Sequence, residues 1–402
     1  MSELDKKILK QVQNDNLCTG CGACFNICPK DAIIIKGDEY GFYKPFIDKE
    51  KCINCGLCEK ICPLDKYKSQ NIEQPKVFAF QNNDKETLYK CASGGAFAYF
   101  AKNIIEQGGI VYGVIYDENM VVSHSRTDNL KDLGKMYSSK YVQSGTRDTF
   151  KQAKEDLNNG QTVLFSGTPC QIAGLKSYLQ KDYENLITVD LVCHGVPSPL
   201  IFEKYKNEFA EKLPKDEKLL SINFRSKNRG WNPYSYHLRT NKQDFYILSN
   251  NSIYSQAFLS DLSINDSCFH CQFNGLPRIA DITIGDFWGV DEYDKTLNDN
   301  KGLSLILINS EKGKCLFNKI DNNCLLKEIP LDYAIKHNKN ICGSSVPHKK
   351  RTDFFEEISR GKTLKSCVKK YNKKPFYMVL YRSLPKFMKD FIKYNIIKKE
   401  KC

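Results

Sequence analysis

Eight cysteines near the start of the chain fall into two runs of the same spacing. Each run reads CxxCxxCxxxCP, the first beginning at Cys18 and the second at Cys52. Three closely spaced thiolates can wrap one face of a 4Fe-4S cube, and the glycines within each run permit the tight turns that this needs. The pattern is that of a duplicated bacterial ferredoxin motif. It predicts two 4Fe-4S clusters that carry single electrons.

The fourth cysteine of each run is expected to ligate the cluster of the other run. The first cluster then takes Cys18, Cys21, Cys24 and Cys62. The second cluster takes Cys52, Cys55, Cys58 and Cys28. A pair of zinc sites is the alternative, but zinc does not need three evenly spaced cysteines followed by a fourth before proline.

Four more cysteines lie close to apolar, strand-like runs far along the chain. Cys170 comes after 162–165, Cys193 directly follows 186–192, and Cys268 and Cys271 form a CxxC pair just before ADITIG. Ligands of parallel sheets bind beyond the carboxyl ends of the strands, so these thiols could meet on one rim and hold a third 4Fe-4S cluster. By spacing alone, the CxxC pair could also be a redox dithiol or half a zinc site, and Cys170 a nucleophile with a lowered pKa.

Two other segments have residue types that suit a phosphate group. Ser93, Gly94 and Gly95 precede a predicted helix, whose free amides and dipole favour anions, although a glycine pair also serves in caps and turns. Lys140 lies among hydroxyls in 137–144, a pattern that more often belongs to a solvated loop. The chain has no GxGxxG and no P-loop, which leaves open a flavin bound in a less common way.

Three units are needed to position these residues. A dicluster ferredoxin domain is expected over 1–70, and an α/β flavin-binding domain over 75–348, where short Val/Ile/Leu-rich runs alternate with helical segments. That alternation predicts a largely parallel, covered sheet with strands at 77–80, 110–116, 162–165, 186–192, 282–285 and 303–309. A basic helical tail is expected over 349–402. The fold class is therefore α+β for the first unit and α/β for the second.

In this order, the motifs resemble the family of the coenzyme F-420 hydrogenase/dehydrogenase beta subunit. The resemblance spans about residues 15–345 and includes CASGGAF, SSKYVQS, SGTPCQIAGLK, DLVCHGVPSP, ADITIGDFWG and KGLSLILIN. It implies an iron–sulfur flavoprotein oxidoreductase with FAD beside a 4Fe-4S cluster. Carried over by residue, it places FAD against Ser93, Gly94 and Gly95, with Ser139 and Lys140 near the flavin or its phosphates. It makes ligands of Cys170, Cys193, Cys268 and Cys271.

The resemblance also implies a function. Electrons pass between the clusters and FAD, and a hydride passes to or from an organic substrate or deazaflavin, in some relatives in a polysaccharide context. A ferredoxin or another redox protein is the expected partner, and a small molecule or saccharide the expected substrate. The alternatives are an electron-transfer subunit of a larger complex without its own substrate site, and a scaffold or sensor with structural clusters. No proton donor can be named.

Several further thiols and imidazoles lie near these motifs or apart from them. Cys91 and His194 flank the motifs, and either a place at the site or a structural role suits them. His270, inside the CxxC pair, is expected behind the ligands. The remaining cysteines follow no ligand spacing and are expected to be ordinary thiols: Cys315, Cys324, Cys342, Cys367 and Cys402.

Nearly all of the excess positive charge lies in the predicted tail. Residues 349–402 hold 17 Lys+Arg against 5 Asp+Glu, a net charge of +12 out of the chain's +13. Leu384, Phe387, Met388, Phe391 and Ile392 follow helical spacing, which suits either an anionic membrane surface or packing on the protein itself. Nucleic-acid binding is not expected, because no recognition fold accompanies the charge. Without a signal peptide or a membrane-spanning run, a cytoplasmic location is expected, with peripheral contact at the inner membrane face as an option.

Overall fold

The N-terminal unit is a pair of short helices beside a β-hairpin. The computed structural model describes residues 17–64, 71, 72 and 74–372. Helices α2 (Ala23–Ile27) and α3 (Leu57–Lys60) each begin after a glycine with positive φ, Gly22 at 84° and Gly56 at 71°. Strands β1 (Ile33–Gly37) and β2 (Tyr43–Ile47) pair antiparallel. The stretch between the two cysteine runs therefore contains a complete hairpin.

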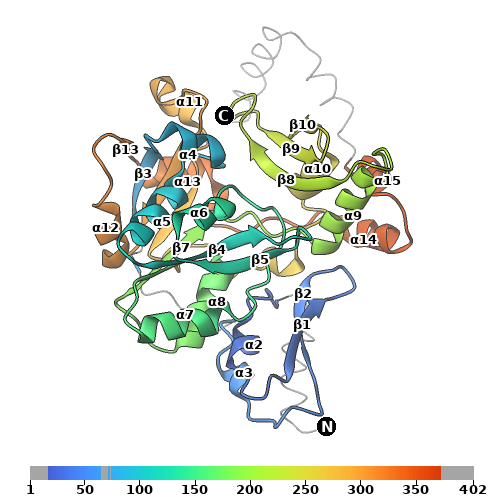
Figure 1. Cartoon of the computed structure of the whole chain (residues 1–402), viewed down its shortest axis with the longest axis horizontal. Coiled ribbons are helices and arrows are strands. Elements are labelled where there is room, and N and C mark those ends of the chain that lie inside the picture. The colour runs from blue at the N-terminus through green and yellow to red at the C-terminus, as the bar shows by residue number, and fades with distance from the viewer. Residues whose placement is uncertain (1–16, 65–70, 73, 373–402) are drawn as a thin grey trace, which may run out of the picture.

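An eight-stranded sheet forms the centre of the larger unit (Figure 1). Its order is β13-β3-β12-β11-β7-β6-β4-β5. The strands are β3 (Lys76–Gln81), β4 (Ile110–Tyr116), β5 (Val122–Thr127), β6 (Val163–Ser166), β7 (Leu186–Leu191), β11 (Ile282–Asp286), β12 (Ser304–Ile308) and β13 (Leu325–Ile329). All six strands expected from the sequence are present, within a residue or two at their ends.

The prediction of a largely parallel sheet is wrong, because the sheet is mixed. Strands β4, β6, β7 and β11 run parallel in the middle, while β5 at one edge and β12, β3 and β13 at the other pair antiparallel. Helices cover both faces, so an antiparallel strand such as β12 is as continuously apolar as a parallel one. Apolar runs alone therefore could not reveal the direction of pairing.

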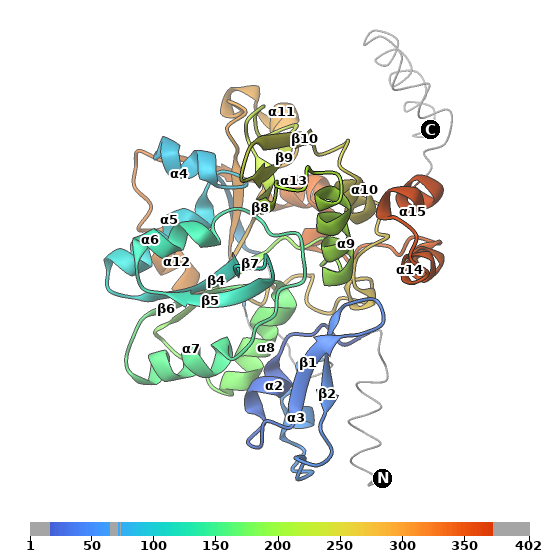
Figure 2. The ribbon, with the colours of Figure 1, turned by 45° about the vertical axis from the view of Figure 1, so that its right-hand side comes forward.

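The two faces of the sheet are covered by different elements. Helices α7 (Thr149–Asn158) and α8 (Pro169–Leu179) pack on one face, and Cys21, Ala23 and Ile61 of the ferredoxin unit join their apolar core. Helices α5 (Ala96–Glu106), α6 (Leu130–Leu133) and α12 (Glu311–Phe317) cover the other face. Figure 2 shows the ferredoxin unit, drawn in blue, beneath α8. The shorter helices are α4 (Lys85–Lys90), α11 (Val290–Tyr293) and α13 (Leu331–His337).

A second, three-stranded sheet was not expected from the sequence. It consists of β8 (Leu219–Ser226), β9 (Ser235–Thr240) and β10 (Asp244–Leu248), and packs with α9 (Pro199–Ala210) and α10 (Ile253–Leu259). Helices α14 (Arg351–Ser359) and α15 (Leu364–Tyr371), from the region predicted as a tail, bury Phe354, Leu364 and Val368 in the same core. The amphipathic segment Leu384–Ile392 lies outside the described residues.

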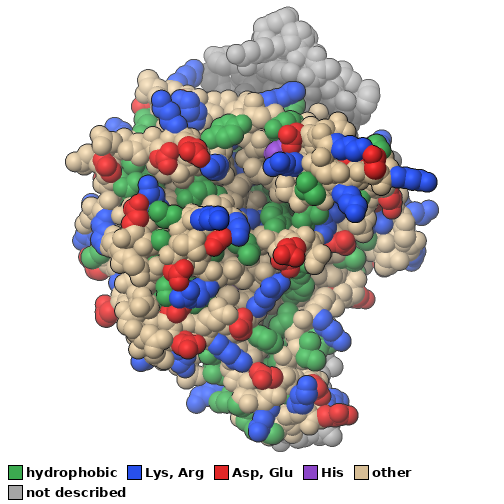
Figure 3. All heavy atoms as spheres, viewed as in Figure 1, with side chains coloured by type: hydrophobic (Ala, Val, Ile, Leu, Met, Phe, Trp, Pro, Cys, Tyr) green, Lys and Arg blue, Asp and Glu red, His purple; other side chains and the backbone are tan. Residues whose placement is uncertain are grey.

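Charged side chains of both signs are intermixed over the face of the molecule in Figure 3. Among the residues that the structure describes, no helix has the length and apolar character that crossing a membrane requires.

Candidate iron–sulfur and flavin sites

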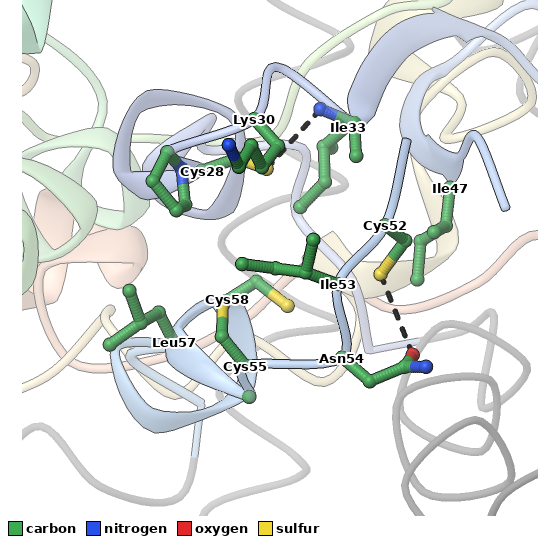
Figure 4. A pocket seen from close by; sticks show the side chains of 13 residues that line it. Cys28, Lys30, Ile33, Ile47, Cys52, Ile53, Asn54, Cys55, Leu57 and Cys58 are labelled. Atoms are coloured by element: carbon green, nitrogen blue, oxygen red, sulfur yellow. Dashed lines mark hydrogen bonds between the residues drawn. The ribbon is translucent and has the colours of Figure 1, made fainter. Parts of the chain in front are cut away.

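The outermost set of cysteines lies in the ferredoxin unit. Cys28, Cys52, Cys55 and Cys58 line one pocket together with three isoleucines, Ile33, Ile47 and Ile53 (Figure 4). The Ala32 amide donates to Cys28 Sγ at 3.3 Å, and the Cys52 thiol lies 3.6 Å from Asn54 Oδ1. Cys55 and Ile53 are exposed, so this site opens to the surface of the unit.

The inner set of cysteines lines the neighbouring pocket of the same unit. It consists of Cys18, Cys21, Cys24 and Cys62, with Cys58 at the border between the two pockets. Burial raises the pKa of the Cys21 thiol, and the nearby Cys62, Cys18 and Cys170 raise it further. The grouping is the crossed one: the last cysteine of each run lies with the first three of the other run.

A third set of cysteines gathers at the start of α8. Burial raises the pKa of Cys193 well above its usual range, and Cys268, Cys170 and Cys271 add to the shift. Burial and Cys271 likewise raise the pKa of Cys170 to about 11. Each thiol is within electrostatic reach of others in the set, although the four come from three separate segments. Cys170 and Cys193 follow β6 and β7, parallel neighbours in the sheet.

The close approach of these thiols indicates which kind of metal group they can bind. Each thiolate disfavours ionisation of the others, so the sets could ionise together only around a positively charged group. Within the described part of the chain, no three His, Cys, Asp or Glu side chains are arranged to hold a single metal ion. A four-iron cube bonds each thiolate to a different iron, and its site is wider than that of one ion. The donor sets therefore fit iron–sulfur cubes.

Helix α8 lies between the inner and third cysteine sets and contacts both. Thr168 caps it with a capping box to Gln171, and the Thr168 hydroxyl lies 3.2 Å from Cys170 Sγ. One turn after Cys170, Gly174 faces the ferredoxin unit, and a Cβ at this position would come within 2.9 Å of Cys21 Sγ. Thr19, from the loop between Cys18 and Cys21, also hydrogen-bonds Cys170. The loop that carries the inner set therefore contacts a thiol of the third set directly.

The ferredoxin unit is also held at its hairpin and its loops. Phe42 is buried in the core formed by α9, α14 and the small sheet, and Gly41 lies so close to Leu200 that a Cβ there would come within 2.3 Å of Leu200 Cβ. Gln143 is 3% exposed and accepts a hydrogen bond from Tyr43 N at 2.7 Å. Its amide donates to Thr19 O at 3.2 Å. The two units form one continuous body.

Two family models match the chain. Residues 17–66 match a 4Fe-4S dicluster domain, and residues 160–333 match the family described as the C terminus of the coenzyme F420 hydrogenase/dehydrogenase beta subunit. Over residues 160–333 the chain is therefore similar to this beta-subunit family. The predicted resemblance and the predicted dicluster domain are thereby confirmed, and the chain is an iron–sulfur, electron-transfer protein related to a hydrogenase/dehydrogenase subunit.

A solved structure also resembles the chain. A chain of the F420-reducing [NiFe] hydrogenase complex from Methanosarcina barkeri aligns with a TM-score of 0.46 and 17% identity, covering 71% of this chain and 92% of that chain. No curated protein sequence matches.

The two segments expected at the flavin approach each other around Cys91. Burial raises the pKa of Cys91 to about 12, against the effect of Lys227 and Lys140, whose positive charges lie nearby. Burial also lowers the pKa of Lys140 to about 7. The Lys140 ammonium donates to the carbonyls of Lys135 and Tyr137, both at 2.8 Å. Lys227, which is buried, and Lys140, which is half-buried, therefore both lie beside the loop that precedes α5.

The three predicted residues of that loop have structural roles as well. The Ser93 hydroxyl donates to Leu303 O at 2.8 Å. A Cβ at Gly94 would come within 2.1 Å of Phe80 O, so this glycine permits close packing against β3. Gly95, with φ at 85°, is the N-cap of α5. Of the second segment, Ser139 is half-buried next to Lys140.

A polar cluster beside this loop was missed from the sequence. The Arg225 guanidinium, 2% exposed, binds both Asp286 carboxylate oxygens at 2.8 and 2.9 Å and donates to Ala92 O at 3.0 Å. Trp231 donates to Asp286 at 2.8 Å and stacks on Trp288 with an interplanar angle of 3°. GDFWG was noted as a motif, but nothing in the spacing links Asp286 to Arg225, because the arginine comes from the unexpected second sheet.

The remaining candidate residues are two histidines and the cysteines outside the three sets. His194 pairs with Asp261 at 2.9 Å and lies 3.3 Å from the Ser345 hydroxyl, while His270 is exposed. Among the cysteines outside the three sets, Cys315 and Cys342 are exposed and Cys324 and Cys367 are buried. Cys402 lies outside the described residues.

Proposed function

We propose that the protein is an iron–sulfur flavoprotein oxidoreductase with three 4Fe-4S clusters in series and one FAD. Two clusters occupy the ferredoxin unit, and the third is held by Cys170, Cys193, Cys268 and Cys271. The observation that carries the proposal is that these four thiols come together from three segments at α8, within electrostatic reach of one another and directly against the inner ferredoxin set. Isolated structural thiols would not need to converge in this way from three segments.

The family resemblance and two lysine side chains support the flavin. Lys140 and Lys227 lie near Cys91, and the Lys227 ammonium donates to Leu88 O at 2.7 Å and Ser93 O at 2.6 Å. Ammonium groups fixed this way suit the phosphates of FAD, and the amides at the start of α5 add to the positive field. The flavin, when bound, supplies hydride chemistry on one side and single-electron chemistry on the other.

The chain's own residues then bind the flavin, orient it and exclude water from it. The Arg225–Asp286 pair fixes the loop at Ala92, because the guanidinium is held on one side by the carboxylate and on the other by a backbone carbonyl. Trp231 and Trp288 cover the pair with stacked rings. Thr168 and Thr19 hold Cys170 between the third set and the ferredoxin loop. Electrons enter or leave at the exposed Cys55 end, where a ferredoxin or other redox protein docks.

The organic partner is a deazaflavin or another hydride acceptor or donor, with a saccharide intermediate as one option. The second candidate is an electron-transfer subunit that serves a separate enzyme, and the exposed outer site at Cys55 suits both functions. Co-purification of a second subunit would favour the electron-transfer subunit.

Metal and flavin analysis of protein purified without oxygen tests the proposal. At four irons per cluster, we expect about twelve irons and one FAD per chain, and about eight irons in the Cys170→Ser/Cys271→Ser double variant. The control is Cys315→Ser/Cys342→Ser, which changes two exposed thiols outside the sets and should keep about twelve. About eight irons in both the native protein and the double variant would refute the third cluster. Absence of flavin would refute the oxidoreductase mechanism.

A further inference from the structure

A buried lysine lies between the inner ferredoxin set and the third set of cysteines. Lys44, on β2, is 5% exposed, and its ammonium donates to the carbonyl of Cys18 at 2.6 Å. On its other side, its positive charge lowers the pKa of Cys268, which burial otherwise raises to about 12. Lys44 therefore contacts the loop of one set and acts electrostatically on a thiol of the other.

The backbone around Lys44 fixes the ammonium in place. The Gln143 side chain accepts a hydrogen bond from the backbone amide of Tyr43, the residue before Lys44. It also donates a hydrogen bond to the carbonyl of Thr19 in the Cys18 loop. Gly20 lies so close that a Cβ there would come within 2.3 Å of Tyr43 O. Strand β2 and the cysteine loop are therefore locked together, and the lysine projects from this junction.

The environment of Lys44 is unusual for a lysine. Burying an ammonium group is unfavourable unless it is well compensated, and here the carbonyl of Cys18 accepts a hydrogen bond from it. Lys44 also lies directly opposite Lys36 in the β1–β2 ladder, and like charges placed opposite one another destabilise a hairpin. A positive charge is therefore kept at the junction with the cysteine loop.

We propose that Lys44 is a positioning residue whose buried positive charge raises the reduction potentials of the two clusters on either side of it. These are the cluster of Cys18, Cys21, Cys24 and Cys62 and the cluster of Cys170, Cys193, Cys268 and Cys271. The inference rests on the proposed third cluster for its second half only. Reduction adds one negative charge to a cluster, and a fixed cation nearby favours the reduced form, most strongly where water is excluded. The reduced forms of both clusters are then stabilised. An electron that passes between the units therefore does not meet one cluster of much lower potential than the other.

A redox titration followed by electron paramagnetic resonance tests this on the full-length holoprotein. In Lys44→Gln, which keeps a hydrogen-bond donor and removes the charge, we expect two one-electron steps to move to lower potential. Each should shift by about tenfold in its equilibrium constant, or about 59 mV. The step of the outer cluster, ligated by Cys28, Cys52, Cys55 and Cys58, should stay in place. Lys44→Arg, which keeps the charge, should retain all native potentials.

Lys36→Met is the matched control, because it removes the same charge from the cross-strand partner at an exposed site. It should leave every step in place. Unchanged potentials in Lys44→Gln, or an equal shift in Lys36→Met, would overturn the proposal. Loss of iron from Lys44→Gln would overturn it too, since the lysine would then hold the loop and not tune the cluster. The iron count of the native protein distinguishes a failure of this proposal from a failure of the third cluster. If the native protein holds only about eight irons, one reduction step should still shift in Lys44→Gln.

Discussion

Gly174 of α8 lies directly against Cys21 of the ferredoxin unit, with space for no side chain between them. A Cβ at position 174 would come within 2.9 Å of both Cβ and Sγ of Cys21. Because Cys170 is one turn earlier on the same helix, this contact brings the inner and third cysteine sets together. The helix thereby sets the separation between the two cysteine sets.

Gly174→Ala should therefore push the two units apart. The added methyl group meets a cysteine fixed in its loop, so overpacking should lower the free energy of unfolding by about 1–3 kcal/mol. Thermal unfolding of the holoprotein measures this, and limited proteolysis should cut the ferredoxin unit faster. Gly134→Ala is the control, since no atom lies within 4 Å of its Cβ position and its φ of −57° suits alanine. Equal stability of the two variants would show that Gly174 is not a contact.

The crossed arrangement of the ferredoxin cysteines can be tested with two single variants. Cys62→Ser and Cys28→Ser should each lose about four irons, since each removes one ligand. The clusters lost should differ: the ferredoxin step that moves in Lys44→Gln should disappear in Cys62→Ser and persist in Cys28→Ser. Paramagnetic resonance during reductive titration distinguishes them. The reverse pattern would mean that each run ligates its own cluster.

Lys140→Met should weaken flavin binding. The variant keeps the length of the side chain but removes the buried ammonium proposed to face the flavin phosphates. We expect at least a tenfold rise in the dissociation constant of FAD, measured by fluorescence titration of deflavinated protein. Lys131→Met, an exposed lysine on α6, is the control and should bind as the native protein does. Full flavin occupancy in Lys140→Met would remove this residue from the site.

The buried His124 should make stability depend on pH. Burial lowers its pKa to about 4, and the neutral ring lies 3.1 Å from Ser166 O and 3.4 Å from the Ser144 hydroxyl. Between pH 6.5 and 4 the unfolded chain binds the proton and the folded chain does not. Stability should therefore be complete above pH 6.5 and fall as the pH drops, by on the order of 1 kcal/mol for each pH unit.

Chemical denaturation of the native protein and of His124→Gln at pH 7, 6 and 5 measures this effect. The variant should be less stable at pH 7, since it loses the stacking of the imidazole on Phe165. Its loss of stability between pH 7 and 5 should be smaller than that of the native protein. Parallel pH profiles for the two proteins would show that His124 already binds its proton in the folded state.

The dicluster unit could be predicted from the sequence more fully than the central sheet. Cysteine spacing determines how a loop wraps a cube, and that geometry is local, so the two ferredoxin runs were recognisable without any fold. The direction of β12 depends on the path of the chain between distant strands, which composition does not encode. Lys44 could not be identified because its role depends on Gln143, a residue a hundred positions away that holds the preceding strand residue.

The segment SSKYVQS illustrates how one motif can serve two sites. Its lysine was assigned to the flavin, and Lys140 does lie near Cys91. Three residues later, however, Gln143 points to the ferredoxin unit and binds Thr19 and Tyr43. No spacing rule distinguishes these directions, because the segment between them is irregular and its side chains are oriented by tertiary contacts.

The burial of Cys21 in the core beneath the central sheet affects when the inner cluster can be inserted during folding. Its side chain is 9% exposed and packs with Ala23 and Ile61 against α8. Once α2 rests on α8, this thiol is covered on one side and faces the pocket of the inner set on the other. We therefore expect the inner cube to be delivered most readily while the first sixty-odd residues are still apart from the rest of the chain, before the interface closes over it. Synthesis from the N-terminus suits this order, since the cysteine runs emerge from the ribosome long before α8 does.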